Sequence, residues 1–205
     1  MESVVFFDKI PIDPPREKIY QRLGYKQKTT AITAKQYEET DFHINEAASL
    51  IDLKGMHLRL KINHNDGEKI FLSDDLIFSS KKLSVFLRNC REAILMGATA
   101  GNAIMEAIKE KTRHDDLSVA VVYDAAASEM TDAALDWIMD YVNQTLRREG
   151  KVLLPRRFSA GYADFSLEHQ KTIHEKLQMN KFDVKINPSL ILVPEKSVTA
   201  IGGIC

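Results

Sequence analysis

The chain has 205 residues, with 28 Lys or Arg against 29 Asp or Glu and a formal net charge of −1. A typical domain has ~150 residues, so this length favours a single domain spanning residues 1–205. The balanced charge argues against a dedicated nucleic-acid-binding protein, which usually carries a basic excess. The 44% hydrophobic and 28% charged residues exclude wholesale disorder.

The first part of the chain predicts one strand, two helices and a hairpin. An apolar strand is expected at residues 4–7 and a helix at 16–23, where Pro15 suits the first turn and Gly24 the end. A second helix is expected over residues 33–50. Apolar and charged residues alternate over 58–62, which predicts a strand that turns at residues 64–67 and returns at 69–72.

The middle of the chain predicts helices around one buried strand. Leu83, Phe86 and Leu87 share a helical face, and residues 93–97 form a short apolar strand followed by small residues at 98–101. Those small residues favour close packing of the next helix, with anion binding at its first turn as the alternative. A long amphipathic helix is expected from Ser128 to Gly150. Its polar side carries Asp132, Asp136 and Asp140, a pattern typical of a solvated face.

The last quarter predicts an aperiodic segment, a helix and a second hairpin. Residues 156–164 show no period, and Ser166 is a suitable N-cap for the helix that follows. Residues 190–193 and 197–201 read as two strands joined by a tight turn. Strands and helices are mixed without βαβ alternation, so the expected class is α+β with an antiparallel sheet.

Motifs for self-contained catalysis are not found in the sequence. It has no Gly-x-Ser-x-Gly elbow, no glycine-rich phosphate loop and no histidine or cysteine spacing typical of a metal site. Cys90 and Cys205 could form a disulfide, but two reduced thiols in a cytoplasmic protein are the simpler interpretation. No signal peptide and no apolar run of the ~20 residues that a membrane span needs are present.

The aperiodic segment is the best candidate for a binding site. Arg157 could form a forked contact with a carboxylate, Gly161 would allow backbone to approach a ligand closely, and Tyr162 offers an aromatic ring. A plain surface loop is an equally acceptable interpretation of these residues alone.

Arg157-x-x-x-Gly161-Tyr162 resembles the RxxxGY motif of the S-adenosylmethionine-binding activation domain of cobalamin-dependent methionine synthase. The later residues 189–204, with Pro-x-Lys-Ser-Val-Thr-Ala at 194–200, are similar to the end of that domain. The similarity continues upstream, at residues 23–25, 83–90 and 98–101, in the manner of stand-alone members of the family. It therefore covers nearly the whole chain.

The resemblance implies a curved antiparallel β-sheet with flanking helices and a shallow site for S-adenosylmethionine. In the family, the motif arginine holds the methionine carboxylate, motif backbone holds adenine and ribose, and the tyrosine lies alongside. A family glutamate that binds the amino group corresponds to Asp132, one methylene shorter, and a C-terminal aromatic pair corresponds to positions near Ile201 and Gly202. The implied cofactor-binding residues are Arg157, Phe158, Ser159, Ala160, Gly161, Tyr162 and Asp132.

The resemblance also implies a function. The chain would reactivate, in trans, a methionine synthase or related corrinoid protein whose cobalamin has been oxidised to Co(II), with S-adenosylmethionine as methyl donor. A flavodoxin-like or other donor would supply the electron, and the chain would be an accessory component without a catalytic residue set of its own. The alternative is a corrinoid-protein or S-adenosylmethionine-binding interaction module without reactivating activity. Neither nucleic acid nor membrane is an expected partner, and an unrelated hydrolase or metalloenzyme is disfavoured.

Overall fold

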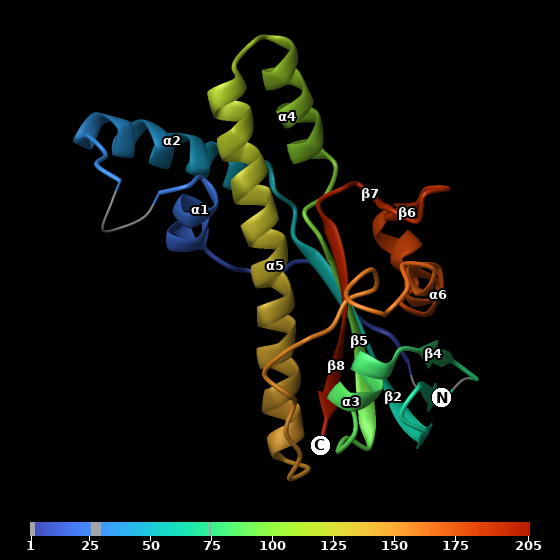
Figure 1. Cartoon of the computed structure of the whole chain (residues 1–205). Helices are drawn as coiled ribbons and strands as arrows, with labels where there is room; N and C mark the ends of the chain where they lie inside the picture. The colour runs from blue at the N-terminus through green and yellow to red at the C-terminus, as the bar shows by residue number, and fades with distance from the viewer. Residues whose placement is uncertain (1–2, 26–29, 74) are drawn as a thin grey trace.

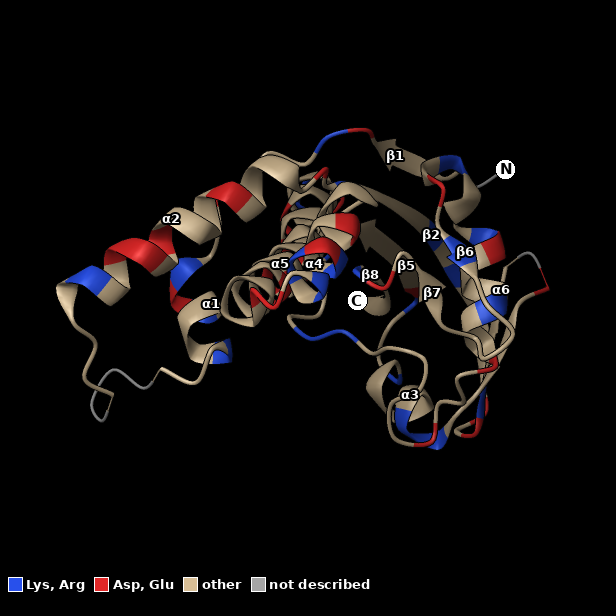
Figure 2. Ribbon diagram, turned by 90° about the horizontal axis from the view of Figure 1, so that it is seen from above, with Lys and Arg blue, Asp and Glu red and all other residues tan. Residues whose placement is uncertain are grey.

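The protein is built on one curved antiparallel sheet with helices on both faces (Figures 1 and 2). The structure is a computed structural model and describes residues 3–25, 30–73 and 75–205. The sheet order is β4 (Ile77–Ser79), β3 (Lys69–Leu72), β2 (Lys54–Asn65), β5 (Glu92–Thr99) and β8 (Ser197–Ile204), and β1 (Val5–Phe7) also pairs with β2. A separate two-stranded sheet joins β6 (Lys185–Ile186) to β7 (Leu192–Val193). The predicted fold class is confirmed.

The helices form two groups, one on each face of the sheet. The first group is α1 (Arg16–Arg22), α2 (Ala34–Leu50), α4 (Ala103–Arg113) and α5 (Leu117–Arg147). The second is α3 (Lys81–Phe86), α6 (His169–Lys176) and a 3-10 turn at Met179–Phe182. In Figure 1, α5 runs along the length of the sheet while α3 and α6 lie on its other side. Seen from above in Figure 2, α2 extends away from the strands.

Alternation along the strands divides the buried residues into two clusters. Met56 and Leu58 of β2 face the α6 side, whereas Ile94 and Met96 of β5 belong to the cluster under α5. Successive side chains of a strand point to opposite faces, so a sheet with helices on both sides needs apolar residues at almost every position. This explains why β5 is buried at every position after Glu92 and extends beyond the predicted 93–97.

The elements expected before residue 73 are confirmed. Strand β1, helices α1 and α2 and the β2–β3 hairpin occur at the expected places, with Ile62 opposite Leu72 and Asn65 opposite Ile70. Thr33 caps α2 through a capping box with Gln36. Strand β2 is longer than predicted because it also pairs with β5 over its first eight residues.

Helix α5 begins eleven residues earlier than the predicted start at Ser128. Residues 117–127 read Leu-Ser-Val-Ala-Val-Val-Tyr-Asp-Ala-Ala-Ala, and many of them are buried because α2 and α4 pack against this part of the helix. A helix covered on several sides has no single apolar stripe, so the amphipathic pattern that identified its second half is missing from the first half.

The predicted C-terminal hairpin is wrong. Strand β7 pairs with β6 and strand β8 pairs with β5, so the two strands belong to different sheets. The turn residues at 194–196 mark a change of direction, but β8 carries an apolar surface that completes the main sheet. Helix α6 also begins at His169, later than expected, and Ser166 accepts a hydrogen bond from the N–H of Glu168 in the preceding turn.

The interpretation of Cys90 and Cys205 as separate reduced thiols is contradicted, since the structure joins them in a disulfide. The cause is the register of the last strand, which places Ile204 opposite Glu92 and brings the end of the chain to the start of β5. A separation of 115 residues hides this proximity from the sequence.

Replacing Ser80 by Ala should lower the free energy of unfolding by about 1 kcal/mol, the usual cost of a lost N-cap. The buried Ser80 hydroxyl accepts from the N–H of Leu83 at 3.0 Å and donates to Asp164 at 2.6 Å. Urea unfolding followed by circular dichroism measures the change. The exposed Ser49→Ala serves as control, and equal stability of the two variants would contradict the proposed cap.

Candidate functional site

The segment before the Arg-x-x-x-Gly-Tyr motif lies beside β8. Bridges join Leu153 to Ile204 and Phe158 to Ile201. The Phe158 N–H donates to the Ile201 carbonyl at 2.8 Å, and the Ile201 N–H donates to the Phe158 carbonyl at 2.7 Å. Both backbone groups of Phe158 therefore fix the motif against the sheet. The resemblance implies that this backbone also contacts a ligand, and only the second lone pair of the Phe158 carbonyl is left for such a hydrogen bond.

A tight turn follows at the motif glycine. Gly161 has φ +85°, a conformation that side-chain-bearing residues rarely adopt, and its N–H donates to the Phe165 carbonyl at 2.8 Å. The Tyr162 N–H donates to the Ser159 carbonyl at 3.2 Å. A Cβ at Gly161 would lie 3.3 Å from Leu167. The glycine is thus required by the turn itself.

Asp164 ties this turn to α3. Its carboxylate accepts from the Ser80 hydroxyl at 2.6 Å and from the backbone N–H of Lys81 at 2.8 Å. These hydrogen bonds, the one from Ser80 first, hold the pKa of Asp164 below its usual range. The motif is therefore held at both ends, by β8 before it and by α3 after it.

The structure brings Arg157 and Asp132 together. The Arg157 guanidinium donates to Asp132 Oδ1 at 2.6 Å and is also hydrogen-bonded to Asp136 Oδ1. Burial lowers the pKa of Arg157, but the hydrogen bonds with Asp136 and Asp132 outweigh it and the pKa is raised. Two members of the aspartate row on α5 thus pair with the motif, which corrects the expectation of a solvated face, while Asp140 is exposed as expected.

Two small cavities flank the start of β8. The first, of about 210 Å³, is lined by Asp132 and other residues of α5, and the second, of about 200 Å³, is lined by Ser159 and Ala160 of the motif. Glu195, Ser197 and Val198 line both. The motif backbone and the acidic residue named from sequence therefore border one continuous stretch of surface.

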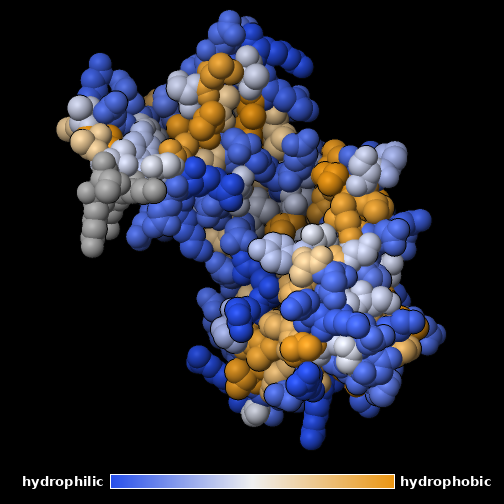
Figure 3. All heavy atoms as spheres, in the orientation of Figure 1, coloured by the Kyte–Doolittle hydropathy of each residue, from blue (hydrophilic) through white to orange (hydrophobic). Residues whose placement is uncertain are grey.

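The second cavity offers polar groups beside an apolar rim. Gln170 is 6% exposed; its Oε1 accepts from the Thr199 hydroxyl at 3.0 Å, while its amide nitrogen has no partner among the described residues. The N–H and carbonyl of Ala160 are also without partners in the described part of the chain. In Figure 3, apolar residues gather over β7, where Ile191 and Val193 are exposed and Ile191 lines this cavity.

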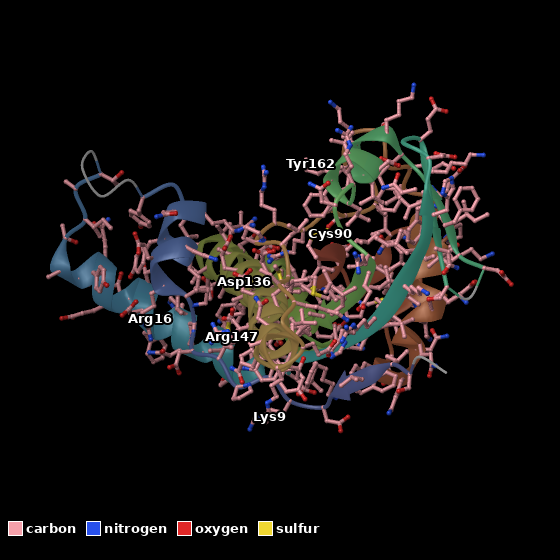
Figure 4. All side chains as sticks on the ribbon, turned by 90° about the horizontal axis from the view of Figure 1, so that it is seen from below. Lys9, Arg16, Cys90, Asp136, Arg147 and Tyr162 are labelled. Carbon is pink, nitrogen blue, oxygen red and sulfur yellow. A yellow bond between two sulfur atoms is a disulfide. The ribbon has the colours of Figure 1, made fainter. Side chains whose placement is uncertain are left out.

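Tyr162 is placed away from these cavities. Its side chain is 72% exposed and meets only the edge of the Phe158 ring at 6.3 Å. Figure 4 shows Tyr162 at the surface, apart from Asp136. Tyr162 lines neither of the two cavities, and its position beside a ligand stays a prediction. Ile201, near which the resemblance puts the family's aromatic pair, is fully buried in the core.

Lys196 is a site residue that sequence reasoning missed. Its ammonium contacts Asp124 at 2.6 Å and Ser128 at 2.9 Å and lines the first cavity with 15% of the side chain exposed. It stands directly before β8, where no periodic pattern distinguishes a cavity-lining lysine from a turn lysine.

Neither a metal-binding cluster nor a membrane-spanning helix is found among the residues that the structure describes. No group of three or more His, Cys, Asp or Glu could hold a metal ion in that part of the chain. No helix within it is both long and apolar enough to cross a membrane.

The fold and the site define an α+β domain with a curved sheet and a shallow paired-charge surface beside its last strand. Among solved structures it is similar to the crystal structure of the MetH reactivation domain bound to AdoHcy, with a TM-score of 0.69 and 14% sequence identity over 98% of this chain and 78% of that chain. No family model and no curated protein matches the sequence. The chain therefore shares the fold of that reactivation domain.

Proposed function

We propose that this chain binds S-adenosylmethionine and acts as a stand-alone reactivation component for a separate cobalamin-dependent methionine synthase. The observation that carries the proposal is the pairing of Arg157 with Asp132 beside the motif turn, on a fold shared with a domain that binds AdoHcy. A guanidinium and a carboxylate at one place complement the carboxylate and ammonium of an α-amino acid. In the complex, the ion pair between Arg157 and Asp132 would open, and these residues would bind the carboxylate and the ammonium of the ligand, respectively.

The second cavity suits the other end of the ligand. The unpartnered Ala160 backbone and the Gln170 amide can exchange hydrogen bonds with an adenine edge, and the apolar rim at Ile191 can cover its face. Arg157 and Asp132 would hold the amino-acid end near the first cavity. The described residues thus fit the ligand, and they act by binding and orienting it.

The chemistry belongs to the two cofactors. S-adenosylmethionine would supply an electrophilic methyl group, which the partner's cobalamin would accept once a flavodoxin-like or other donor had supplied one electron. This chain needs no acid or base for that transfer. The cytoplasm is proposed as its compartment only because the partner enzyme would act there.

Calorimetric titration tests the ligand, and a spectrum tests the function. S-adenosylmethionine should bind one site per chain. Oxidised methionine synthase mixed with a reductant, S-adenosylmethionine and this protein should then form methylcobalamin, seen in the visible spectrum, and should not do so when the protein is omitted. Equal formation without the protein would reject the reactivation role.

The second candidate is an interaction module without reactivating activity. It is favoured by the occupied state of Arg157, which two aspartates already neutralise, and by the solvent-exposed Tyr162. Binding to the corrinoid protein without methylcobalamin formation would support this alternative.

A further inference from the structure

A cavity separate from the two that flank the start of β8 lies far along the sheet, near β1, β2 and the start of β5. It measures about 640 Å³, within the usual range for small-molecule sites. Four cationic side chains line it, together with one carboxylate and a histidine. The lining residues are Ser3, Val5, His57, Arg59, Lys61, Arg91, Glu92 and Lys151.

Two of the four cations are neutralised within the protein. Arg59 forms hydrogen bonds with Glu92 and, through two nitrogens at 2.7 and 2.6 Å, with Glu149. Lys151 contacts the same two carboxylates at 2.7 and 3.0 Å. The hydrogen bonds, that from Arg59 first, lower the pKa of Glu92 and lower that of Glu149 to about 2. At neutral pH the two cations and the two carboxylates of this network cancel, so the network holds this wall of the cavity in place without adding net charge.

The other two cations have no carboxylate partner among the residues that the structure describes. Lys61 and Arg91 are exposed, and neither forms an ion pair with any described residue. Lys61 lies two residues after Arg59 on the same face of β2 and opposite Glu92 in register, but Glu92 is taken by Arg59 and Lys151. Counted over residues 3–25, 30–73 and 75–205, the cavity therefore carries about two unbalanced positive charges.

The remaining wall is uncharged and is formed by Ser3, Val5 and His57. The His57 ring contacts the rings of Phe7 and Tyr141, with centroids at 5.7 and 6.3 Å, and both of its ring nitrogens are buried without a described partner. Burial lowers the pKa of His57 to about 4, so the imidazole is neutral at pH 7. Val5 adds an aliphatic side chain. A planar, uncharged group can therefore pack against this wall.

We propose that this cavity binds an organic phosphate, with the phosphate at Lys61 and Arg91 and a planar group toward His57 and Val5. A phosphate monoester carries a charge of about −1.5 to −2 at pH 7, which matches the two unbalanced cations. Arginine forks onto phosphate oxygens and lysine contacts them as a point charge. The site is separate from the motif at residues 157–162 and does not depend on S-adenosylmethionine.

The test uses uridine 5′-monophosphate as probe and uridine as its phosphate-free control. Binding is measured by calorimetry and by the NMR resonances of the His57 imidazole. We expect the monophosphate to bind and to shift those resonances, and uridine to do neither. The double variant Lys61→Gln/Arg91→Gln should weaken binding about tenfold or more, since it removes charge-assisted hydrogen bonds. Added S-adenosylmethionine should leave the affinity unchanged.

A matched control removes the same net charge elsewhere. Arg113→Gln/Lys171→Gln changes two exposed cations on α4 and α6 and should leave uridine 5′-monophosphate binding within about twofold. Equal weakening in both double variants, binding of uridine as strong as that of the monophosphate, or no binding of the monophosphate at all would each overturn the proposal. None of these results bears on whether S-adenosylmethionine binds at the motif, so either proposal can be rejected without the other.

Discussion

Changing Arg157 to Ala should weaken S-adenosylmethionine binding by about 2–3 kcal/mol, or roughly 30- to 150-fold, the scale of a lost charge-assisted hydrogen bond. The guanidinium is the cation adjacent to both Asp132 and the motif turn, and only 19% of the side chain is exposed. Without it, Asp132 and Asp136 would repel the ligand carboxylate. Calorimetric titration measures the loss, and circular dichroism checks the fold.

Arg157→Lys is the matched control for this change. Lysine keeps the positive charge but lacks the planar fork, so its affinity should lie between those of the wild type and the alanine variant. Asp136 and Asp132 are both about half-exposed, so the alanine variant should still fold. A folded Arg157→Ala protein with undiminished affinity would remove the motif from the proposed site.

Local patterns predicted the first half of the fold because its elements are each exposed on one side. Helix α2 has a capping box, and the β2–β3 hairpin shows alternation and turn residues. The start of α5 and the full length of β5 were not predictable in this way, because residues covered on several sides lose their period. The pairing of β8 with β5 is a contact between distant segments that no local window contains.

The same division applies to the candidate site. The motif resemblance identified Arg157 and Asp132, and the structure pairs them. Asp136 also binds the Arg157 guanidinium and would compete with a ligand for it, and this contact depends on the angle at which α5 passes the motif. The exposure of Tyr162 depends on the turn at Gly161. Both are tertiary properties. The free amide nitrogen of Gln170 is a third such property, because it depends on the hydrogen bond between the Gln170 oxygen and Thr199.

Ile138→Ala should produce the largest loss of stability, about 2–5 kcal/mol, because it leaves a cavity where α5 crosses β2. Ile138 is fully buried, and its Cδ1 occupies the space above Gly55, only 2.8 Å from where a Cβ at that position would lie. Urea unfolding measures the change, with Ile138→Val expected to cost about 0.5–1.5 kcal/mol. Asp140→Ala, on the exposed side of the same helix, should stay within about 0.5 kcal/mol of the wild type. An Ile138→Ala protein as stable as the wild type would contradict the inferred packing of α5 against β2 at Gly55.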